Sequence, residues 1–404
     1  MERIPFPNTV RTVRDINRSK VLRCIEQWPG ISRKEITQKV GLTDAAVSRI
    51  TREIIDCGLV VENADGESNG RPGRRHIGLN IRPEGGFVFA ACLTVSDKSL
   101  TLLDLSGKPV ATGTLADDAV TDLDALTGAI DRQSRKLRKT ADAAKHRILG
   151  IAAVMAGSVN HKTGFINISS LNALSQTPFA SALEERLKIP VQVETLGNAL
   201  NVAHKRDARD FRDGQTTLLV YVAMGMGASW IIEGIPHRAE HDERLIAHVP
   251  TTDGRDGKTM PLLAEVSGYA ILCKLHGVPP DPARHDFATH FEPDVLAQAI
   301  NTAREGDPHV TSLFRMAGHK LGQHLFSICA ALSPDHVALA GPVPQIAAYG
   351  DAVRAGLTQT FGTLGLDAPH VSVSPMSFLR ATELFALEEF LYGSRLDLKR
   401  LLAD

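Results

Sequence analysis

Small, polar and basic side chains recur on one side of residues 44–54. At helical spacing this side carries Asp44, Ala45, Ser48, Arg49 and Arg52. The other side of the same segment is apolar and consists of Ala46, Val47, Ile50 and Ile54. Serine and arginine side chains can hydrogen-bond base edges and phosphates. The pattern therefore predicts a helix that buries one side and offers the other to a DNA major groove.

A basic loop follows at residues 70–75, where the sequence reads GRPGRR. Its arginines, Arg71, Arg74 and Arg75, stand among glycine and proline, so the backbone is too irregular for a helix and the charges stay in solvent. Short strand-like runs flank the loop on both sides. A basic loop on a hairpin beside a DNA-reading helix suits phosphates or the neighbouring minor groove. The alternative is a solvated basic hairpin that only links two domains.

Helix caps mark the elements that must position these side chains. Ser32 is a good N-cap with Glu35 three residues later, the spacing of a capping box, and Gly41 is placed to end that helix. Thr43 then caps the next helix after a short turn. We therefore expect residues 1–82 to form a winged helix-turn-helix DNA-binding domain. The two cap residues, Ser32 and Thr43, are included in the predicted DNA-contacting set.

Composition limits the alternatives. The chain has 404 residues, of which 43% are hydrophobic and 23% charged, so it is long enough for more than one globular domain. Residues 1–82 contain 15 Lys/Arg and 10 Asp/Glu, about +5, whereas the remainder contains 30 and 36, about −6. This asymmetry indicates that only the N-terminal part meets nucleic acid. Without a signal-peptide core or a run of roughly 20 apolar residues, we expect a cytoplasmic protein with no membrane contact.

The remainder of the chain has a different pattern of predicted secondary structure. From residue 87 onward, strand-like runs are followed by helical segments, and this succession occurs twice. The pattern predicts a mixed α/β fold with two lobes and a cleft between them. We place the first lobe at residues 83–200 and the second at residues 201–404, with the C-terminal helix returning to the first lobe.

Over its whole length the sequence resembles the ROK family, which groups sugar-responsive repressors, uncharacterised reading frames and sugar kinases. The run GRPGR at residues 70–74, shortly before Gly86, is similar to the junction of wing and body in the repressor branch. The resemblance implies an actin-like or hexokinase-like body, with the ATP clamps and the sugar site between its two lobes.

Compared with this family, the groups needed for phosphoryl transfer are degraded. Residues 92–97 match the first phosphate loop but contain no glycine, and Cys92 takes the place of its acidic residue. Gly225 and Gly227 keep part of the second loop. Leu196 stands where the family has its catalytic aspartate, and a leucine cannot accept a proton from a sugar hydroxyl. We therefore expect no kinase activity and no cofactor.

The zinc motif of the family is also incomplete. His248 matches its histidine, but residues 253–263 contain no cysteine, and the five cysteines of the chain are scattered. A lone histidine with Asp253 and Asp256 cannot make the closed set of four ligands of a structural zinc site. We expect no metal site, and His248 is then a structural or a ligand-contacting residue.

Polar groups between the lobes remain as candidates for binding an effector. By position these are Gly157, Ser170, Asn172, Thr195, Asn198 and His248. The set is less polar than a hexose site should be, so either the effector is not an ordinary hexose or the pocket is vestigial. A charged run at residues 237–244 is expected to be solvated, although it could bind an acidic or phosphorylated effector.

Three functions are compatible with these features. The first is a repressor that binds double-stranded operator DNA as a homodimer or higher homo-oligomer and senses a sugar or sugar derivative. The second is a ROK sugar kinase with an added DNA-binding domain, which requires a carboxylate near Leu196. The third is a ligand-independent dimeric regulator. We favour the first, because the N-terminal motifs predict DNA binding and residue 196 is no proton acceptor.

Overall fold

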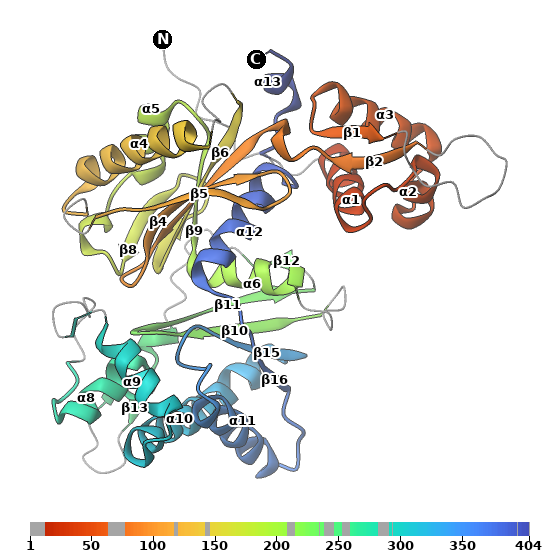
Figure 1. The fold of residues 1–404 in the computed structure, drawn as a ribbon. Coiled ribbons are helices and arrows are strands. Elements are labelled where there is room, and N and C mark those ends of the chain that lie inside the picture. The colour runs from red at the N-terminus through yellow and green to blue at the C-terminus, as the bar shows by residue number, and fades with distance from the viewer. Residues whose placement is uncertain are drawn as a thin grey trace.

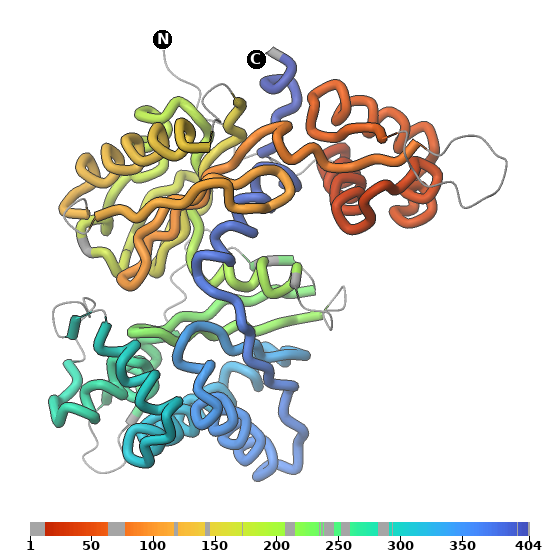
Figure 2. The backbone as a smooth tube through the Cα atoms, in the orientation of Figure 1, coloured from red at the N-terminus to blue at the C-terminus, as the bar shows by residue number. Residues whose placement is uncertain are grey.

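The computed structural model consists of a small N-terminal domain and two larger lobes (Figures 1 and 2). It describes residues 13–63, 77–116, 120–141, 146–207, 215–233, 235–237, 246–252, 259–281, 291–292, 294–393 and 395–403. Within these ranges, every helix is too short or too polar to cross a membrane. The mixed α/β fold predicted from the sequence is confirmed.

The N-terminal domain is a three-helix unit completed by a two-stranded antiparallel hairpin. Its elements are α1 (Val13–Gln27), α2 (Arg33–Val40), α3 (Asp44–Asp56), β1 (Val60–Asn63) and β2 (Gly78–Ile81). The apolar side of α3 is buried together with Ile36 of α2 and Leu22 of α1. This is the winged helix-turn-helix arrangement expected from the caps and spacing. The wing loop, with Arg71, Arg74 and Arg75, lies outside the described residues.

The first lobe is built on a five-stranded sheet with helices on both faces (Figure 1). In the order β5-β4-β3-β6-β9, its strands are β5 (Pro109–Thr114), β4 (Lys98–Asp104), β3 (Phe87–Leu93), β6 (Ile148–Met155) and β9 (Val191–Thr195). Alternate residues of β3 belong to opposite layers. Phe89 shares a core with α4 (Leu123–Thr140) and α5 (Phe179–Leu187). Val88 shares the other core with α12 (Phe378–Phe390), which packs along α6 (Leu196–Asp207).

The second lobe repeats the plan with helices on its outer side (Figure 1). In the order β12-β11-β10-β15-β16, its strands are β12 (Ile235–Pro236), β11 (Met226–Ile232), β10 (Thr217–Val222), β15 (His336–Ala340) and β16 (His370–Val373). The helices are α7 (Leu263–Val266), α8 (Gly268–His276), α9 (Val295–Arg304), α10 (Pro308–Leu332) and α11 (Ala347–Gly362). The last two approach closely, because a Cβ at Gly322 would lie 2.2 Å from the carbonyl oxygen of Val353.

Two short hairpins complete the lobes. One is β7 (Gly157–Asn160) with β8 (Phe165–Ser169), inserted between β6 and α5 of the first lobe. The other is β13 (Pro250–Thr252) with β14 (Thr259–Pro261) in the second lobe. The start of β7 and the end of β8 lie at the space between the lobes, with Gly157, Ser158 and Ser169 facing it.

The C-terminal segment joins the three parts. After β16, α12 packs against β3 and β6 of the first lobe, and α13 (Leu398–Ala403) lies against α3 of the N-terminal domain. Arg147, just before β6, donates hydrogen bonds to the carbonyl oxygens of Leu401 at 2.8 Å and Cys57 at 2.5 Å. The N-terminal domain is thereby attached to the first lobe both directly, through Arg147 and Cys57, and through the C-terminal segment. The domain boundaries expected at residues 82 and 200 stay a prediction.

Candidate DNA-binding surface and inter-lobe cavity

The outer side of α3 is open to solvent. The preceding helix α2 ends at Gly41, whose φ of 66° is left-handed, and Thr43 caps α3 by accepting a hydrogen bond from the Ala46 amide at 3.3 Å. The five outer residues Asp44, Ala45, Ser48, Arg49 and Arg52 are all exposed. Small, polar and cationic groups therefore form one continuous face, the side-chain types that DNA-reading helices use.

Ser32 has a different environment from the other predicted DNA-contacting residues. It is 8% exposed, and its hydroxyl lies 2.7 Å from Oε2 of Glu35, which also accepts the Ser32 amide at 2.9 Å. The capping box expected from the sequence is therefore formed. With its hydrogen-bonding groups used inside the domain, Ser32 supports α2; direct contact with DNA stays a prediction.

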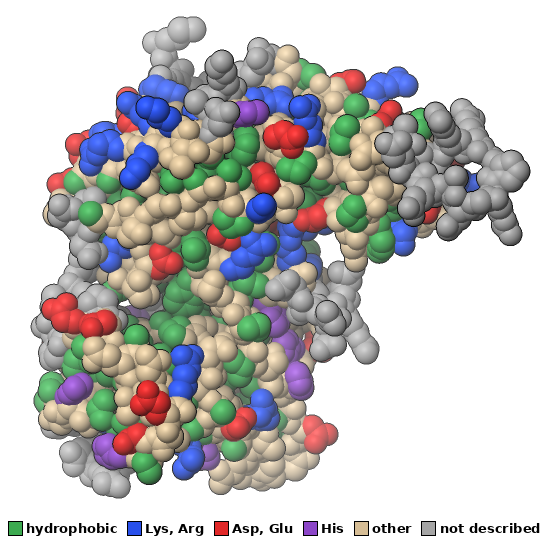
Figure 3. Space-filling view, viewed as in Figure 1, with side chains coloured by type: hydrophobic (Ala, Val, Ile, Leu, Met, Phe, Trp, Pro, Cys, Tyr) green, Lys and Arg blue, Asp and Glu red, His purple; other side chains and the backbone are tan. Residues whose placement is uncertain are grey.

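A cavity of about 380 Å³ lies between the two lobes. Four of the six predicted effector-binding residues line it, namely Gly157, Ser170, Thr195 and His248. Asn198 is 1% exposed and is not among the lining residues, and the side chain of Asn172 is not described. Figure 3 shows hydrophobic side chains in the narrow region between the two lobes.

Asn198 instead belongs to a buried polar cluster around Glu194. The Glu194 carboxylate is fully buried, and its Oε1 accepts hydrogen bonds from the Asn198 amide group at 3.0 Å and the Thr195 backbone at 2.8 Å. His161 Nδ1 lies 3.1 Å from the same oxygen. Through these hydrogen bonds Glu194 stabilises the start of α6, and it does not line the cavity. The carboxylate nearest in sequence to Leu196 is therefore hydrogen-bonded inside the first lobe.

Leu196 itself lines the cavity and is 1% exposed. The first-loop segment beside it is closed on itself, because the Thr94 amide donates to the carbonyl oxygen of Asp97 at 2.8 Å and Asp97 N donates to Thr94 Oγ1 at 3.0 Å. Burial raises the pKa of Cys92 to about 12, so this residue is a neutral thiol where the family carries an acid. Neither position supplies a charge.

The second-loop segment connects β10 and β11 as a tight turn. The carbonyl oxygens of Ala223 and Met224 accept hydrogen bonds from the amides of Gly268 and Tyr269, at 2.8 and 2.9 Å, in the first turn of α8. These helix N-terminal amides, which could otherwise hold an anion, are satisfied by the turn. A Cβ at Gly227 would lie 2.6 Å from the Tyr221 ring, so packing is sufficient to explain this glycine.

Several lining residues were not predicted from the sequence. They are apolar or aromatic and include Tyr221, Met224, Met226, Leu296, Ile300 and Phe378. Tyr221 and Phe378 contact edge to face, with ring centroids 6.1 Å apart, although they lie far apart along the chain. No local motif marks such residues, because β10, β11, α9 and α12 meet only in the folded protein.

No metal cluster is formed by the part of the chain that the structure describes: it contains no group of three His, Cys, Asp or Glu residues placed to hold an ion. Asp253 and Asp256 lie outside that part. His248 belongs to the short 3-10 turn Ile246–His248 and lines the cavity. All five cysteines are buried and reduced.

Two family models match the chain. Residues 14–61 match a winged helix-turn-helix DNA-binding model, and residues 97–379 match the ROK family model. The second match spans well over half of the chain, so this protein belongs to the ROK family. The resemblance carried by the sequence motifs is confirmed.

Curated relatives include transcriptional regulators. The chain is 30% identical over 234 residues to the DNA-binding transcriptional dual regulator NagC of Escherichia coli (strain K12) and to the N-acetylglucosamine repressor of Shigella flexneri. These matches cover 56% of this chain and 54% of each relative, so the chain spans about half the length of the curated relatives it matches. A transcriptional regulator of Mycobacterium tuberculosis (strain ATCC 25618 / H37Rv) is 24% identical over 334 residues, covering 80% of this chain and 74% of the relative.

Solved structures share the fold. A ROK family transcriptional regulator, described as a homologue of the E. coli MLC protein, superposes with a TM-score of 0.76 at 19% identity and covers 97% of this chain and 100% of its own. A ROK family glucokinase from Streptomyces griseus, solved with glucose and AMPPNP, gives a TM-score of 0.59 at 17% identity and covers 74% and 98%. At these identities the likeness concerns the fold alone.

Proposed function

We propose that this protein is a DNA-binding transcriptional repressor whose body senses a carbohydrate-related effector. The proposal rests chiefly on the exposed, polar and basic side of α3 in a winged helix-turn-helix domain that is fixed to a ROK body. The printed names of its relatives, a transcriptional dual regulator and an N-acetylglucosamine repressor, support it. Such a protein acts on double-stranded operator DNA in the cytoplasm and regulates genes of carbohydrate metabolism.

Within the DNA-binding domain we assign different roles to the predicted residues. Arg49, Arg52 and Ser48 read base edges or phosphates, while Asp44 and Ala45 lie at the start of the helix where it meets the groove. The wing arginines Arg71, Arg74 and Arg75 hold the flanking groove or backbone. One helix and one wing bind weakly, so we propose a homodimer on two related half-sites.

The body acts without phosphoryl transfer in this proposal. A kinase needs a carboxylate within hydrogen-bond reach of the attacking hydroxyl, whereas the residue at that place is Leu196. The first loop is closed by its own hydrogen bonds, and two carbonyl oxygens of the second loop accept hydrogen bonds from the first turn of α8. Gly157, Ser170, Thr195 and His248 are proposed effector contacts, because they line the cavity. Asn198 supports them through Glu194.

The test is operator binding by the full-length protein. Genome-wide footprinting locates the operators, and Arg49→Ala should then lower specific affinity by roughly 1–3 kcal/mol. Arg135→Ala is a matched control, because Arg135 is an exposed arginine of α4 in the first lobe, paired with Asp131. Footprints that do not change with Arg49→Ala would remove α3 as the reading helix.

A further inference from the structure

We infer that the inter-lobe cavity takes an uncharged ligand that joins a hydroxylated ring to an alkyl or aryl group, and not a free or phosphorylated hexose. The inference rests on the proposed function, because it names the chemical class of the effector. It starts from the lining residues, whose chemistry differs between the two lobes.

The first lobe contributes most of the hydroxyl groups. Its lining side chains include Thr94, Ser96, Ser158, Ser169, Ser170 and Thr195. The Ser170 hydroxyl is buried and has no hydrogen-bond partner among the described residues. Serine and threonine hydroxyls both donate and accept hydrogen bonds, so those that face the cavity can pair with hydroxyl groups of a ligand. This wall therefore suits a ring with hydroxyl groups.

The second lobe contributes apolar surface. Its lining residues include Met224, Met226, Leu263, Leu296 and Ile300, and Phe378 at the start of α12 adds a further apolar side chain. Thioether side chains adapt to irregular apolar ligands, and aromatic rings offer large apolar contact area. A free hexose would leave this wall in contact with water or with hydroxyl groups, so the wall adds affinity only for a ligand with an apolar group.

Among the described residues, both walls lack carboxylate, ammonium and guanidinium groups, and His248 contributes an imidazole. The described lining residues include no Asp, Glu, Lys or Arg. Burial raises the pKa of Tyr221 to about 12, so its hydroxyl also stays neutral. A phosphate placed here would lose its hydration and meet no Lys or Arg among the described lining residues, only the imidazole of His248. A volume of about 380 Å³ is in the range of small-ligand sites, which is roughly 300–1,000 Å³.

Isothermal titration of the full-length protein tests the ligand class with matched sets. Glucose, galactose and N-acetylglucosamine are each compared with their phenyl and hexyl glycosides and their 6-phosphates. We expect at least one ring for which a glycoside binds ten-fold or more tightly than the parent sugar and the phosphate. Equal or tighter binding of the parent sugars or phosphates, or no binding by any member, overturns the inference.

Two variants test whether a preference for glycosides arises in the cavity or from nonspecific binding to the protein surface. Met226→Gln keeps the side-chain length but makes the apolar wall polar, so the preference for the glycoside should fall at least five-fold. Met316→Gln on α10, 48% exposed in the wild type, should leave the preference unchanged. Operator footprints are recorded on the same proteins. Intact footprints without a glycoside preference overturn this inference alone, whereas absent footprints overturn the proposed function.

A separate observation concerns the route from the cavity to the DNA-binding domain. Two helices begin at the cavity, because Leu196 starts α6 and Phe378 starts α12, and both residues line it. The same helices lead to α1 of the N-terminal domain. Arg206 of α6 pairs with Glu26, and Glu388 of α12 pairs with Arg23.

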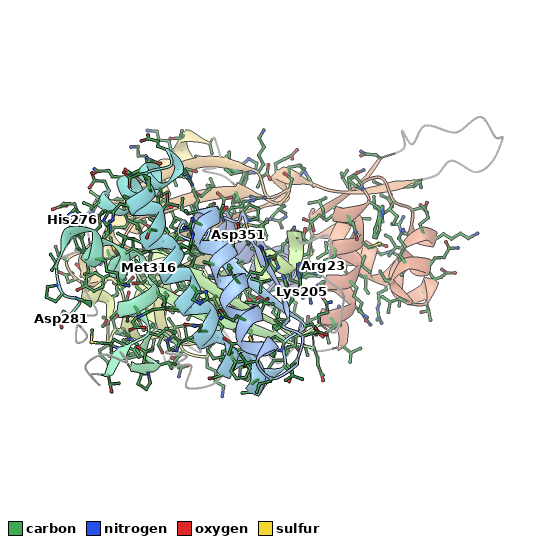
Figure 4. The ribbon with its side chains drawn as sticks, turned by 90° about the horizontal axis from the view of Figure 1, so that it is seen from below. Arg23, Lys205, His276, Asp281, Met316 and Asp351 are labelled. Carbon is green, nitrogen blue, oxygen red and sulfur yellow. The ribbon has the colours of Figure 1, made fainter. Side chains whose placement is uncertain are left out.

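Tyr392 joins these two ion pairs. It follows α12, is 1% exposed, and its ring has the guanidinium of Arg23 at 4.9 Å and that of Arg206 at 5.0 Å from the centroid. Figure 4 shows Arg23 and Lys205, the neighbour of Arg206, at the seam between the N-terminal domain and the body. We infer that this five-residue junction, formed by Arg23, Glu26, Arg206, Glu388 and Tyr392, transmits a change in the cavity to α1.

A thermodynamic cycle tests the junction. Phe378 and the end of α12 are separated by roughly 20 Å of helix, a distance at which independent substitutions add. We expect the effects of Phe378→Ala and Tyr392→Leu on operator affinity to deviate from additivity at least three-fold, while Phe378→Ala with Met316→Gln adds. Tyr392→Phe, which keeps the ring, should restore the coupling. Additive effects overturn the inference.

Hydrogen exchange provides a readout that needs no DNA. Phe378→Ala should change amide exchange in α1, and Tyr392→Leu should abolish that response. Unchanged exchange in α1 upon Phe378→Ala overturns the junction as a route. Because this measurement is independent of operators, its failure can be told apart from a failure of the proposed function.

Discussion

The outer side of α3 and the inter-lobe cavity differ in how their polar groups are used. On α3, polar and basic side chains point into solvent and keep their hydrogen-bonding capacity for a partner. Around the cavity, Glu194 and Asn198 are bound to each other, and Leu196 takes the place beside them. We therefore propose that the first region contacts a charged polymer and that the second encloses a small neutral molecule. The prediction of the largest effect therefore concerns a charge placed in the cavity.

Leu196→Asp should lower the free energy of unfolding by about 3–5 kcal/mol, because an aspartate there would be a buried charge without a partner. Urea unfolding of the full-length protein measures the change, and Leu196→Asn, similar in size to Asp but uncharged, is the control and should cost less. A variant of wild-type stability that also phosphorylates a sugar in a coupled assay would contradict the description of a neutral cavity.

The opposite manipulation removes charge from the DNA-binding domain. Replacing Arg71, Arg74 and Arg75 together by alanine should make the slope of log affinity against log salt shallower by about 2–3, since each phosphate contact contributes roughly 0.9. At low salt, operator affinity should fall well over ten-fold. Fluorescence anisotropy over a salt series gives the slope, with Arg135→Ala as the control. An unchanged slope would favour the alternative of a solvated linker hairpin.

The same two regions differ in how well the sequence predicted them. In the N-terminal domain the signals are local: Ser32 and Glu35 are three residues apart, and Gly41 ends the helix that they begin. The cavity depends on contacts between distant segments, such as the Tyr221 and Phe378 rings. The family motif predicts Asn198 as an effector contact; in the structure its side-chain amide donates to Glu194, and contact with an effector stays a prediction. The local sequence does not encode which way the side chains point where β9 ends and α6 begins.

Cys92, which is fully buried two residues before the cavity-lining Thr94, allows a smaller test of burial next to the cavity. Burial raises its pKa from 9.0 to about 12, so the unfolded chain ionises this thiol first as the pH rises. The stability contributed by the neutral thiol is complete below pH 9 and is lost between pH 9 and 12, on the order of 1 kcal/mol of it by pH 10. Cys92→Ala should narrow the difference in unfolding free energy between pH 7 and pH 10 by that amount. Parallel pH profiles for the two proteins would contradict the burial of an uncharged thiol.

The smallest effect separates support from contact within the DNA-binding domain. Ser32→Ala should lower the free energy of unfolding by about 1 kcal/mol, because it removes the side-chain half of the capping box. Operator affinity of the folded variant should stay within a factor of two, since the Ser32 hydroxyl is bound to Glu35. Thr43→Ala is the comparison, because Thr43 caps α3 from an exposed position beside the reading side. The contrary result is that Ser32→Ala weakens operator binding more than Thr43→Ala does and leaves the stability unchanged. That result would show that Ser32 contacts DNA directly and is not only a cap of α2.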